Sequence, residues 1–421
     1  MARIVLATMG SLGDLHPMIA LGLGLRERGH SIVINTWSGY REKVESLGIE
    51  FAPLRPDVDI DDRELHARAM DARTGPEFVI KELILPNIRA MYDDVMAATE
   101  GADILINGEI VYVGDAVART RHIKWISSCL APLTMFSSHD PNVYPQASWV
   151  FDLLRPMPVA FHNALFGVMR WTIRDWFEPY RKFRKELGLS EDHDPVFTDK
   201  FAPLLHLAMF SRVLGEPQPD WPPQTVQTGT CFFDESETSQ LQPELAEFLE
   251  QGEPPIVFTL GSAAVLDARD FFDESIAAAK VLNKRAVVLY GRDCPRPHGL
   301  NRDIVGFEYA PYSLIFPRAA CVVHQAGVGT ASQVLRAGVP AVIVPFSHDQ
   351  PDNAARCRRQ GAAIIVNRDN YNRKTAAKAI EAILSNADYQ SNATRLASIV
   401  LSENGILTAC NAIENVLNPA R

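Results

Sequence analysis

The sequence predicts an α/β fold in which two doubly wound parallel-sheet domains face each other across a cleft. Short apolar strands alternate with helical segments over residues 3–54, and the same alternation returns over residues 256–360. The stretch between them, 234–255, is polar, acidic and interrupted by proline, which is typical of a linker. Such alternation indicates parallel sheets covered by helices on both faces. The ends of two such sheets leave a ligand cleft between them.

Length and composition limit the alternatives. A chain of 421 residues suits two or three domains at about 150 residues each. With 47% apolar and 22% charged residues, it is neither disordered nor fibrous. The net charge of −10 argues against a nucleic-acid binder. No apolar run is long enough for a membrane span, and the run 4–7 is too short for a signal peptide.

The six cysteines are scattered and include no CxxC pair. Neither a zinc site nor a dithiol redox motif is therefore expected. Reduced thiols are typical of the cytoplasm, which is the predicted location.

The elements of the N-terminal half follow from local signals. An apolar strand over 3–8 ends in a glycine turn, and apolar residues at helical spacing then follow Pro17 up to Gly29. Proline is favoured in a first turn and glycine just past a helix end, so we expect Pro17 in the first turn of this helix. Further strands are predicted over 30–36, 49–54, 103–107, 124–128 and 225–228, with a helix over 40–47.

The C-terminal half repeats this pattern. Strands are predicted over 256–260, 285–290, 321–324 and 341–345, and helices over 271–282, 327–337 and 353–360. The resulting domains are 1–233, a linker 234–255, and 256–403. The last segment, 404–421, is an amphipathic helix that can cross back to the N-terminal domain.

The most informative motif follows the strand that ends at His324. The next helix opens with Gly327, Val328, Gly329 and Thr330. A helix N-terminus binds anions through its free N–H groups and its dipole, and a histidine before it can donate to a phosphate oxygen. The motif predicts a phosphate site that needs neither lysine nor metal. For the glycines alone, an ordinary strand–helix turn is the alternative.

A second polar motif, Asp349-Gln350, follows the strand over 341–345. A carboxylate beside an amide offers both acceptors and donors, which suits sugar hydroxyls. The alternative is a capping cluster before the helix at Asn353.

Residues 309–353 resemble the donor-binding signature of family 1 nucleotide-sugar glycosyltransferases, which have the GT-B fold of two Rossmann-like domains. The bacterial signature reads His-x-Gly-Gly-x-Gly-Thr, then Gly-Val-Pro, then Asp-Gln. This chain has 324–330 with Ala326 in place of one glycine, then 338–340, then 349–350. The likeness covers nearly the whole chain and is strongest to rhamnolipid rhamnosyltransferase catalytic chains and sterol-type glucosyltransferases.

The resemblance implies the donor contacts. His324 and the backbone of 327–330 would hold the diphosphate, with Ser262 helping from the facing loop. Asp349 and Gln350 would hold sugar hydroxyls. Tyr309 and Pro311 would border a uracil or thymine base, although Tyr312 stands where plant members have glutamine. No cofactor or metal is expected, and the acidic run 57–62 is interpreted as an exposed loop and not as a metal-binding DxD motif.

The resemblance also points to Asp14 as the general base. Asp14 lies where plant members have their catalytic histidine and related bacterial enzymes often keep aspartate. A helix-stabilising carboxylate is the alternative role, and His16 is the alternative base. Asn107 occupies the place of the plant enzymes' orienting aspartate but carries no charge, which favours Asp14 acting alone. Glu109 is a further group that could face the cleft.

The segment 149–185 is rich in aromatic residues and basic toward its end. It stands where the family has its variable acceptor region and suits an apolar acceptor or a peripheral membrane contact. Packed helices that shield the site are the alternative. The sequence gives no indication of oligomeric state.

We therefore expect an inverting, metal-independent transferase that moves a hexose from a UDP- or dTDP-sugar to a hydroxyl of a hydrophobic acceptor. A sugar-nucleotide epimerase and a non-catalytic sugar-nucleotide-binding protein are the alternatives. A nicotinamide oxidoreductase fits poorly, because the first turn lacks GxGxxG and the second strand ends without an acidic residue.

Overall fold

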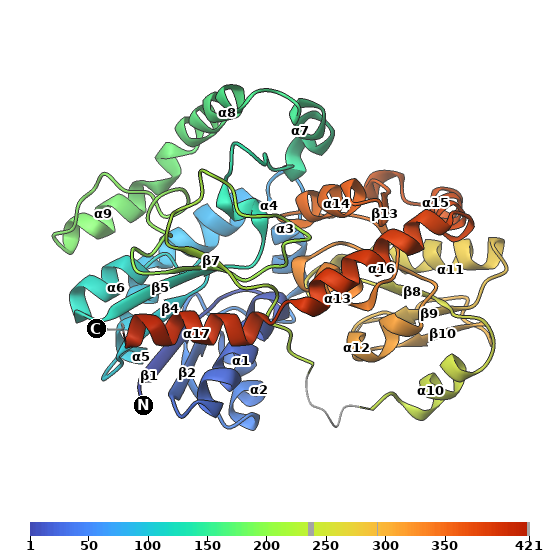
Figure 1. Ribbon diagram of the computed structural model, residues 1–421, viewed down its shortest axis with the longest axis horizontal. Helices are drawn as coiled ribbons and strands as arrows, with labels where there is room; N and C mark the ends of the chain where they lie inside the picture. The colour runs from blue at the N-terminus through green and yellow to red at the C-terminus, as the bar shows by residue number, and fades with distance from the viewer. Residues whose placement is uncertain (235–239, 293, 419–421) are drawn as a thin grey trace.

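The computed structural model describes residues 1–234, 240–292 and 294–418, and contains two parallel sheets side by side (Figure 1). The N-terminal sheet has the order β3-β2-β1-β4-β5-β6-β7 and the C-terminal sheet the order β10-β9-β8-β11-β12-β13. The strand order reverses between β1 and β4 and between β8 and β11. Ligands of doubly wound sheets bind where the strand order reverses. The loops after these four strands are therefore expected to form the ligand site.

The strands of the first sheet are β1 (Arg3–Ala7), β2 (Ser31–Thr36), β3 (Glu50–Pro53), β4 (Ile104–Asn107), β5 (Lys124–Cys129), β6 (His206–Ala208) and β7 (Thr225–Gln227). Those of the second are β8 (Ile256–Thr259), β9 (Ala286–Leu289), β10 (Ile304–Phe307), β11 (Cys321–His324), β12 (Ala341–Ile343) and β13 (Ala363–Ile365). Helices cover both faces of each sheet, so the central strands β1, β4, β8 and β11 are buried on both sides. This burial is why they appear in the sequence as continuous apolar runs.

The N-terminal helices are α1 (Leu12–Glu27), α2 (Arg41–Ser46), α3 (Arg63–Ala69), α4 (Gly75–Glu77), α5 (Ile88–Ala98), α6 (Gly114–Arg121), α7 (Ser148–Leu154), α8 (Val159–Thr172) and α9 (Glu178–Glu186). The remaining helices are α10 (Pro243–Glu250), α11 (Phe271–Val281), α12 (Tyr312–Ile315), α13 (Val328–Ala337), α14 (Gln350–Arg359), α15 (Arg373–Ser385), α16 (Ala387–Ser402) and α17 (Gly405–Leu417).

Several local expectations need correction. Pro17 lies beyond the first turn, where it was expected: α1 begins at Leu12, because Ser11 and Asp14 form a capping box that starts the helix earlier. Strands β6, β10 and β13 were not predicted, since each is only three or four residues long. The segment expected to be a linker contains α10, and residues 235–239 of that segment lie outside the described residues.

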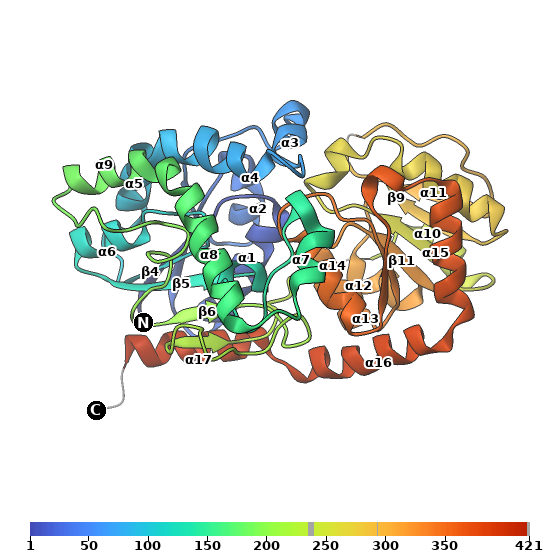
Figure 2. The same ribbon diagram turned by 90° about the horizontal axis from the view of Figure 1, so that it is seen from above.

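The end of the chain joins the two halves. Helix α16 lies along the C-terminal domain on α13, and α17 lies along the N-terminal domain on α1 (Figures 1 and 2). Arg28, directly after α1, forms an ion pair of 2.6 Å with Glu414 of α17. By length and composition the stretch Ala387–Leu417 could cross a membrane, but here it is two helices packed on both domains.

Two further contacts connect the domains. Met70, which follows α3, is buried in the apolar core of the C-terminal domain. Next to it, Ser347 donates to the carbonyl of Asp71 (3.0 Å), and Nε2 of His348 bonds to the carbonyl of Ala69 (2.8 Å). The loop that leads into Asp349 is thereby attached to the opposite domain.

The second contact is a buried ionic network around Arg356 of α14. Its guanidinium pairs with Asp352 (2.7 Å) on its own helix and with Asp140 of the N-terminal domain. It also donates to Asn142 (3.3 Å) and to the carbonyl of Leu214 (2.9 Å). These charged groups fix α14 against the loop that precedes α7.

Candidate active site

The N-termini of α1 and α13 approach each other across the cleft. The two helices are in contact, and a Cβ atom placed on Gly329 would lie 3.9 Å from the Cα of Gly13. Each helix begins immediately after a strand at a reversal point, β1 for α1 and β11 for α13. Two positive helix ends therefore border the same space, which favours a negatively charged ligand.

Asp14 lies in the first turn of α1. Its Oδ2 accepts from the backbone N–H of Ser11 (2.8 Å) and from its hydroxyl (3.3 Å). Among the residues that the structure describes, no group hydrogen-bonds Oδ1. The carboxylate thus has the capping role that was the alternative to catalysis, while one oxygen remains for a ligand.

The electrostatics of Asp14 are unusual for a helix-capping carboxylate. Burial raises the pKa of Asp14 from 3.8 to about 7, the charges of Glu109 and Asp349 add to the increase, and the hydrogen bonds from Ser11 oppose it. A carboxylate with this pKa is a much stronger base than an ordinary aspartate and still ionises near neutral pH. The carboxyl groups of Glu109, which follows β4, and Asp349, which follows β12, thus lie near enough to Asp14 to affect its pKa.

Glu109 is the second of these groups. It follows β4 and its Oε1 accepts from the backbone N–H of Leu130 (2.7 Å). Burial raises its pKa, against the charge of Lys200, which lowers it. Lys200 was not singled out in the sequence. Its ammonium lies 4.4 Å from the ring centre of Phe136, and burial lowers its pKa to about 8.

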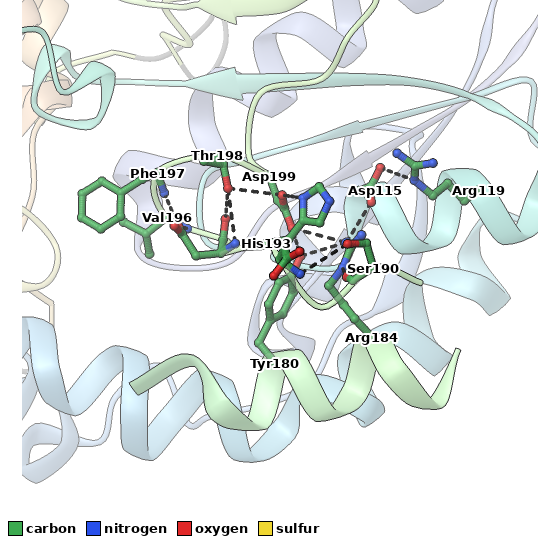
Figure 3. Close-up of polar contacts among 12 residues, drawn as sticks. Asp115, Arg119, Tyr180, Arg184, Ser190, His193, Val196, Phe197, Thr198 and Asp199 are labelled. Atoms are coloured by element: carbon green, nitrogen blue, oxygen red, sulfur yellow. Dashed lines mark hydrogen bonds and ion pairs between the residues drawn. The ribbon is translucent and has the colours of Figure 1, made fainter. Parts of the chain in front are cut away.

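A buried network holds the segment that carries Lys200 (Figure 3). Arg184 of α9 is 1% exposed and pairs with Asp115 (2.8 Å) and Asp199 (3.3 Å). Tyr180 donates to Asp199 (2.8 Å), and His193 bonds to the other oxygen of the same carboxylate. No local pattern in the sequence indicates this network, because its members come from three separate segments.

The other groups predicted near the base do not lie with it. His16 is two residues beyond Asp14, which turns it about 200° around the helix. Its ring contacts that of Phe233, with centroids 5.1 Å apart. The amide of Asn107 donates to the carbonyls of Gly108 (2.9 Å) and Val111 (3.0 Å), and its oxygen accepts from the indole of Trp125. Asn107 is thus engaged in holding its own loop.

His324 is buried at the end of β11. Its Nδ1 accepts from the backbone N–H of Ala326 (3.1 Å), and burial lowers its pKa to about 3. The imidazole is therefore neutral with its proton on Nε2, which makes it a hydrogen-bond donor. Ala326 has a φ of 69°, the left-handed region that favours glycine, which explains why the family signature has glycine here.

Asp349 and Gln350 lie at the start of α14, beside the N-terminus of α13. Oδ2 of Asp349 accepts from the backbone N–H of Val328 (3.0 Å) and from Asn353 (2.7 Å), and burial raises its pKa to about 7. Gln350 accepts from the backbone N–H of Phe346 (2.8 Å) through its side-chain oxygen. Neither side chain caps α14, which was the alternative: Asp349 lies at the N-cap position but makes no side-chain cap hydrogen bond there. Asp349 instead occupies a backbone N–H of α13 that was assigned to the diphosphate.

The loop after β8 and helix α12 lie against the start of α13: Gly261 is close to Gln325 and Thr330, and α12 contacts α13. Ser262 is exposed, and Pro311 precedes α12. The ring of Tyr309 lies 5.1 Å from the guanidinium of Arg292. Tyr312 bonds through its hydroxyl to Thr259 (2.9 Å), so it holds α12 to β8.

Gln325 fills the space between the two loops of the C-terminal domain. It is buried, and its amide lies so close to Gly261 that a side chain there would collide with it. The glycine of the Gly261-Ser262 turn is therefore required by packing against the helix that opens at Gly327.

Carboxylates of the acidic run 57–62 accept hydrogen bonds from nearby backbone N–H groups. Asp57 accepts from the backbone N–H of Ser38 (2.8 Å), Asp59 from that of Asp61 (3.0 Å), and Asp62 caps α3. Within the described ranges, no three His, Cys, Asp or Glu side chains gather closely enough to hold a metal ion.

Both halves of the chain are similar to domains of known glycosyltransferase families. Residues 4–100 match the glycosyltransferase family 28 N-terminal domain, and residues 286–407 match the erythromycin biosynthesis protein CIII-like, C-terminal domain. O-mycaminosyltylonolide 6-deoxyallosyltransferase from Streptomyces fradiae is 33% identical over 98% of this chain and 97% of its own length. The chain belongs to the nucleotide-sugar glycosyltransferases.

Other relatives agree with this assignment. Sterol 3-beta-glucosyltransferase from Saccharomyces cerevisiae (strain YJM789) is 28% identical over 99% of this glycosyltransferase, which spans 35% of that longer relative. The calicheamicin glycosyltransferase CalG4 superposes with a TM-score of 0.71 at 15% identity, covering 100% of this chain and 99% of that one. The spinosyn rhamnosyltransferase SpnG, complexed with thymidine diphosphate, gives 0.69 at 14% identity, covering 98% and 100%. The predicted GT-B fold and the sterol-glucosyltransferase likeness are confirmed.

Proposed function

We propose that this glycosyltransferase moves a hexose from a UDP- or dTDP-sugar to a hydroxyl of a hydrophobic acceptor, with inversion and without a metal ion. The observation that carries the proposal is the meeting of Asp14, with its raised pKa, and the N-terminus of α13 beside neutral His324. A base for the acceptor and a receiver for the leaving group thus border one space.

In this mechanism Asp14 takes the proton of the acceptor hydroxyl through Oδ1. The acceptor oxygen forms a bond to the anomeric carbon while the bond from that carbon to the β-phosphate oxygen breaks. The leaving nucleoside diphosphate keeps the electron pair, and Nε2–H of His324 and the first N–H groups of α13 receive its charge. Attack from the side opposite to the leaving group inverts the anomeric centre.

The sugar would lie between the helix ends. Asp349 uses Oδ2 for Val328 and Asn353, so its second oxygen is the one proposed for a sugar hydroxyl. Gln350 would contribute its amide, and Ser262 would approach the diphosphate from the facing loop. Tyr309 and Pro311 would border the base. The names of the relatives support a natural-product or sterol-like acceptor. The six scattered cysteines, without a CxxC pair, support the proposed cytoplasmic location.

A ligand screen followed by turnover tests this function. We expect UDP or dTDP to raise the melting temperature, and GDP and NAD to leave it unchanged. The matching sugar nucleotide should then glycosylate a hydrophobic alcohol at a rate that EDTA does not change. Stabilisation by NAD alone would contradict the donor class. Sugar-nucleotide isomerisation without an acceptor would favour the epimerase, and loss of activity in EDTA would exclude the metal-free mechanism.

A further inference from the structure

Helix α8 has an unusual outer face. Most of its exposed residues are small or apolar: Val159, Ala160, Ala164, Gly167, Val168 and Trp171, with Asn163, Arg170 and Thr172 as the polar exceptions. Its inner side has Phe161, Leu165, Phe166 and Met169 beside the buried His162. A surface helix normally carries mainly polar and charged residues on its outer side, so this apolar share is unusual.

Helix α7 and the turn after it continue this surface. Trp149, Leu153 and Met157 are spaced four residues apart and are all exposed, the first two at 73% and 70%. Six of the thirteen exposed large hydrophobic residues in the described chain lie between Trp149 and Trp171. We call the exposed side chains of Trp149, Leu153, Met157, Val168 and Trp171 the apolar ridge.

The apolar ridge belongs to the outermost elements of the molecule. Both views place α7 and α8 outside the two sheets: they form the upper edge in Figure 1, and α8 faces the viewer in Figure 2. No described segment of the chain covers them there. Exposed apolar area of this concentration marks a contact surface.

The charge around the ridge favours an anionic partner. Residues 148–174 carry Arg155, Arg170 and Arg174 against Asp152, a net charge of 3 − 1 = +2. Arg155 and Arg170 pair with Asp140 and Asp194 (2.9 Å each), and Asp152 pairs with Arg358, so the ion pairs of this segment reach into the surrounding chain. The whole chain carries −10, so the remainder carries −12. A basic, apolar segment on an otherwise acidic protein fits an anionic lipid surface, which attracts basic residues and admits apolar ones.

The residue types agree with a bilayer interface. Exposed tryptophans stand at both ends of the ridge, and tryptophan is enriched at the level of the lipid headgroups. We propose that the apolar ridge of α7 and α8 docks this enzyme on the surface of an anionic lipid bilayer.

The position of the ridge connects docking with the proposed reaction. Helix α7 contacts α14, which begins with Gln350 at the proposed sugar site. An acceptor of low water solubility could then reach the cleft from the lipid surface. This connection rests on the proposed function, whereas docking itself does not.

Vesicle sedimentation tests the proposal on the full chain. The probes are vesicles of phosphatidylcholine alone and of equal amounts of phosphatidylcholine and phosphatidylglycerol. Wild type should sediment with the anionic vesicles and much less with the neutral ones. The variant Trp149→Ser/Trp171→Ser should lower the partition coefficient about tenfold or more, since two large apolar side chains no longer enter the interface.

The matched control changes exposed apolar residues elsewhere. Val281 and Leu401 lie on α11 and α16 and are 66% and 67% exposed. The variant Val281→Ser/Leu401→Ser should sediment like wild type. Stabilisation by UDP or dTDP should be the same in all three proteins, so failure of the nucleotide screen would count against the proposed function and not against docking.

Four results would overturn the proposal. Wild type could fail to sediment with anionic vesicles, or both variants could sediment alike. A concentration-dependent dimer that disappears in the tryptophan variant would show that a second copy covers the ridge. If the tryptophan variant lost turnover on a water-soluble acceptor while its sedimentation stayed unchanged, the ridge would bind the acceptor and not the lipid surface.

Discussion

Replacement of Asp14 by asparagine removes the proposed base and leaves its structural role in place. The asparagine side-chain oxygen can still accept from the N–H of Ser11, so the cap of α1 should persist with a loss of stability of at most about 1 kcal/mol. Loss of a general base costs about 10²–10⁴-fold in rate. We therefore expect kcat to fall in this range, while the affinity for UDP or dTDP changes little.

The pH dependence gives a second magnitude. The pKa of Asp14 rises from 3.8 to about 7. One pKa unit corresponds to 1.36 kcal/mol, so this shift disfavours the ionised carboxylate of Asp14 by about 4 kcal/mol relative to its protonated form. The base works only when ionised, so kcat/KM of wild type should fall as the pH falls below about 7, approaching tenfold per unit. Asp14→Asn should lack this decline.

The assay is release of nucleoside diphosphate in the presence of acceptor, measured across the pH range, with nucleotide affinity from calorimetry. His16→Gln is the matched control, because His16 points about 200° away from Asp14 and contacts Phe233. The reasoning is refuted if Asp14→Asn stays within tenfold of wild type or keeps the decline at low pH. A larger loss in the His16 variant than in the Asp14 variant would make His16 the base.

Three further changes test neighbouring parts of the site. Glu109→Gln should move the acidic limb of kcat/KM to lower pH, because it removes a negative charge that raises the pKa of the base; a limb that stays in place or moves upward would contradict this coupling. His324→Ala should weaken UDP or dTDP binding about 10–100-fold in calorimetry, the value of a hydrogen bond to a charged group, and unaltered affinity would remove His324 from the phosphate site. Arg356→Met should lower the free energy of unfolding by about 3–5 kcal/mol in denaturant titration, since Asp140 and Asp352 lose their buried partner, and a change below about 1 kcal/mol would show that the network is not stabilising.

Most of the fold could be predicted from the sequence because its signals are local. Buried central strands appear as apolar runs, and glycines mark the ends of helices such as α1 and α13. The start of α1 was misplaced, because a proline near a helix start is only a preference, whereas the pairing of Ser11 with Asp14 is a specific interaction. Strands as short as β6 and β13 have too few residues to show a period.

The candidate site was predictable only as a set of residues. The sequence indicates His324 and Asp349 through their positions after strands and Asp14 through the family resemblance, and it leaves open whether the two carboxylates bind ligand or stabilise helix ends. In the structure all three also hold their own loops. Lys200 and Arg184 carried no signal, since their partners are distant in the chain.

By itself the sequence determines the two-sheet architecture, the family and the residues that open α1 and α13. Only the tertiary structure decides that these helix ends meet, that Asp14 has a pKa near neutral, and that α8 exposes an apolar face. The physical reason is that strand and helix periods depend on neighbouring residues. A pKa depends on burial and on charges that come from β4 and β12, and exposure depends on which elements cover a helix.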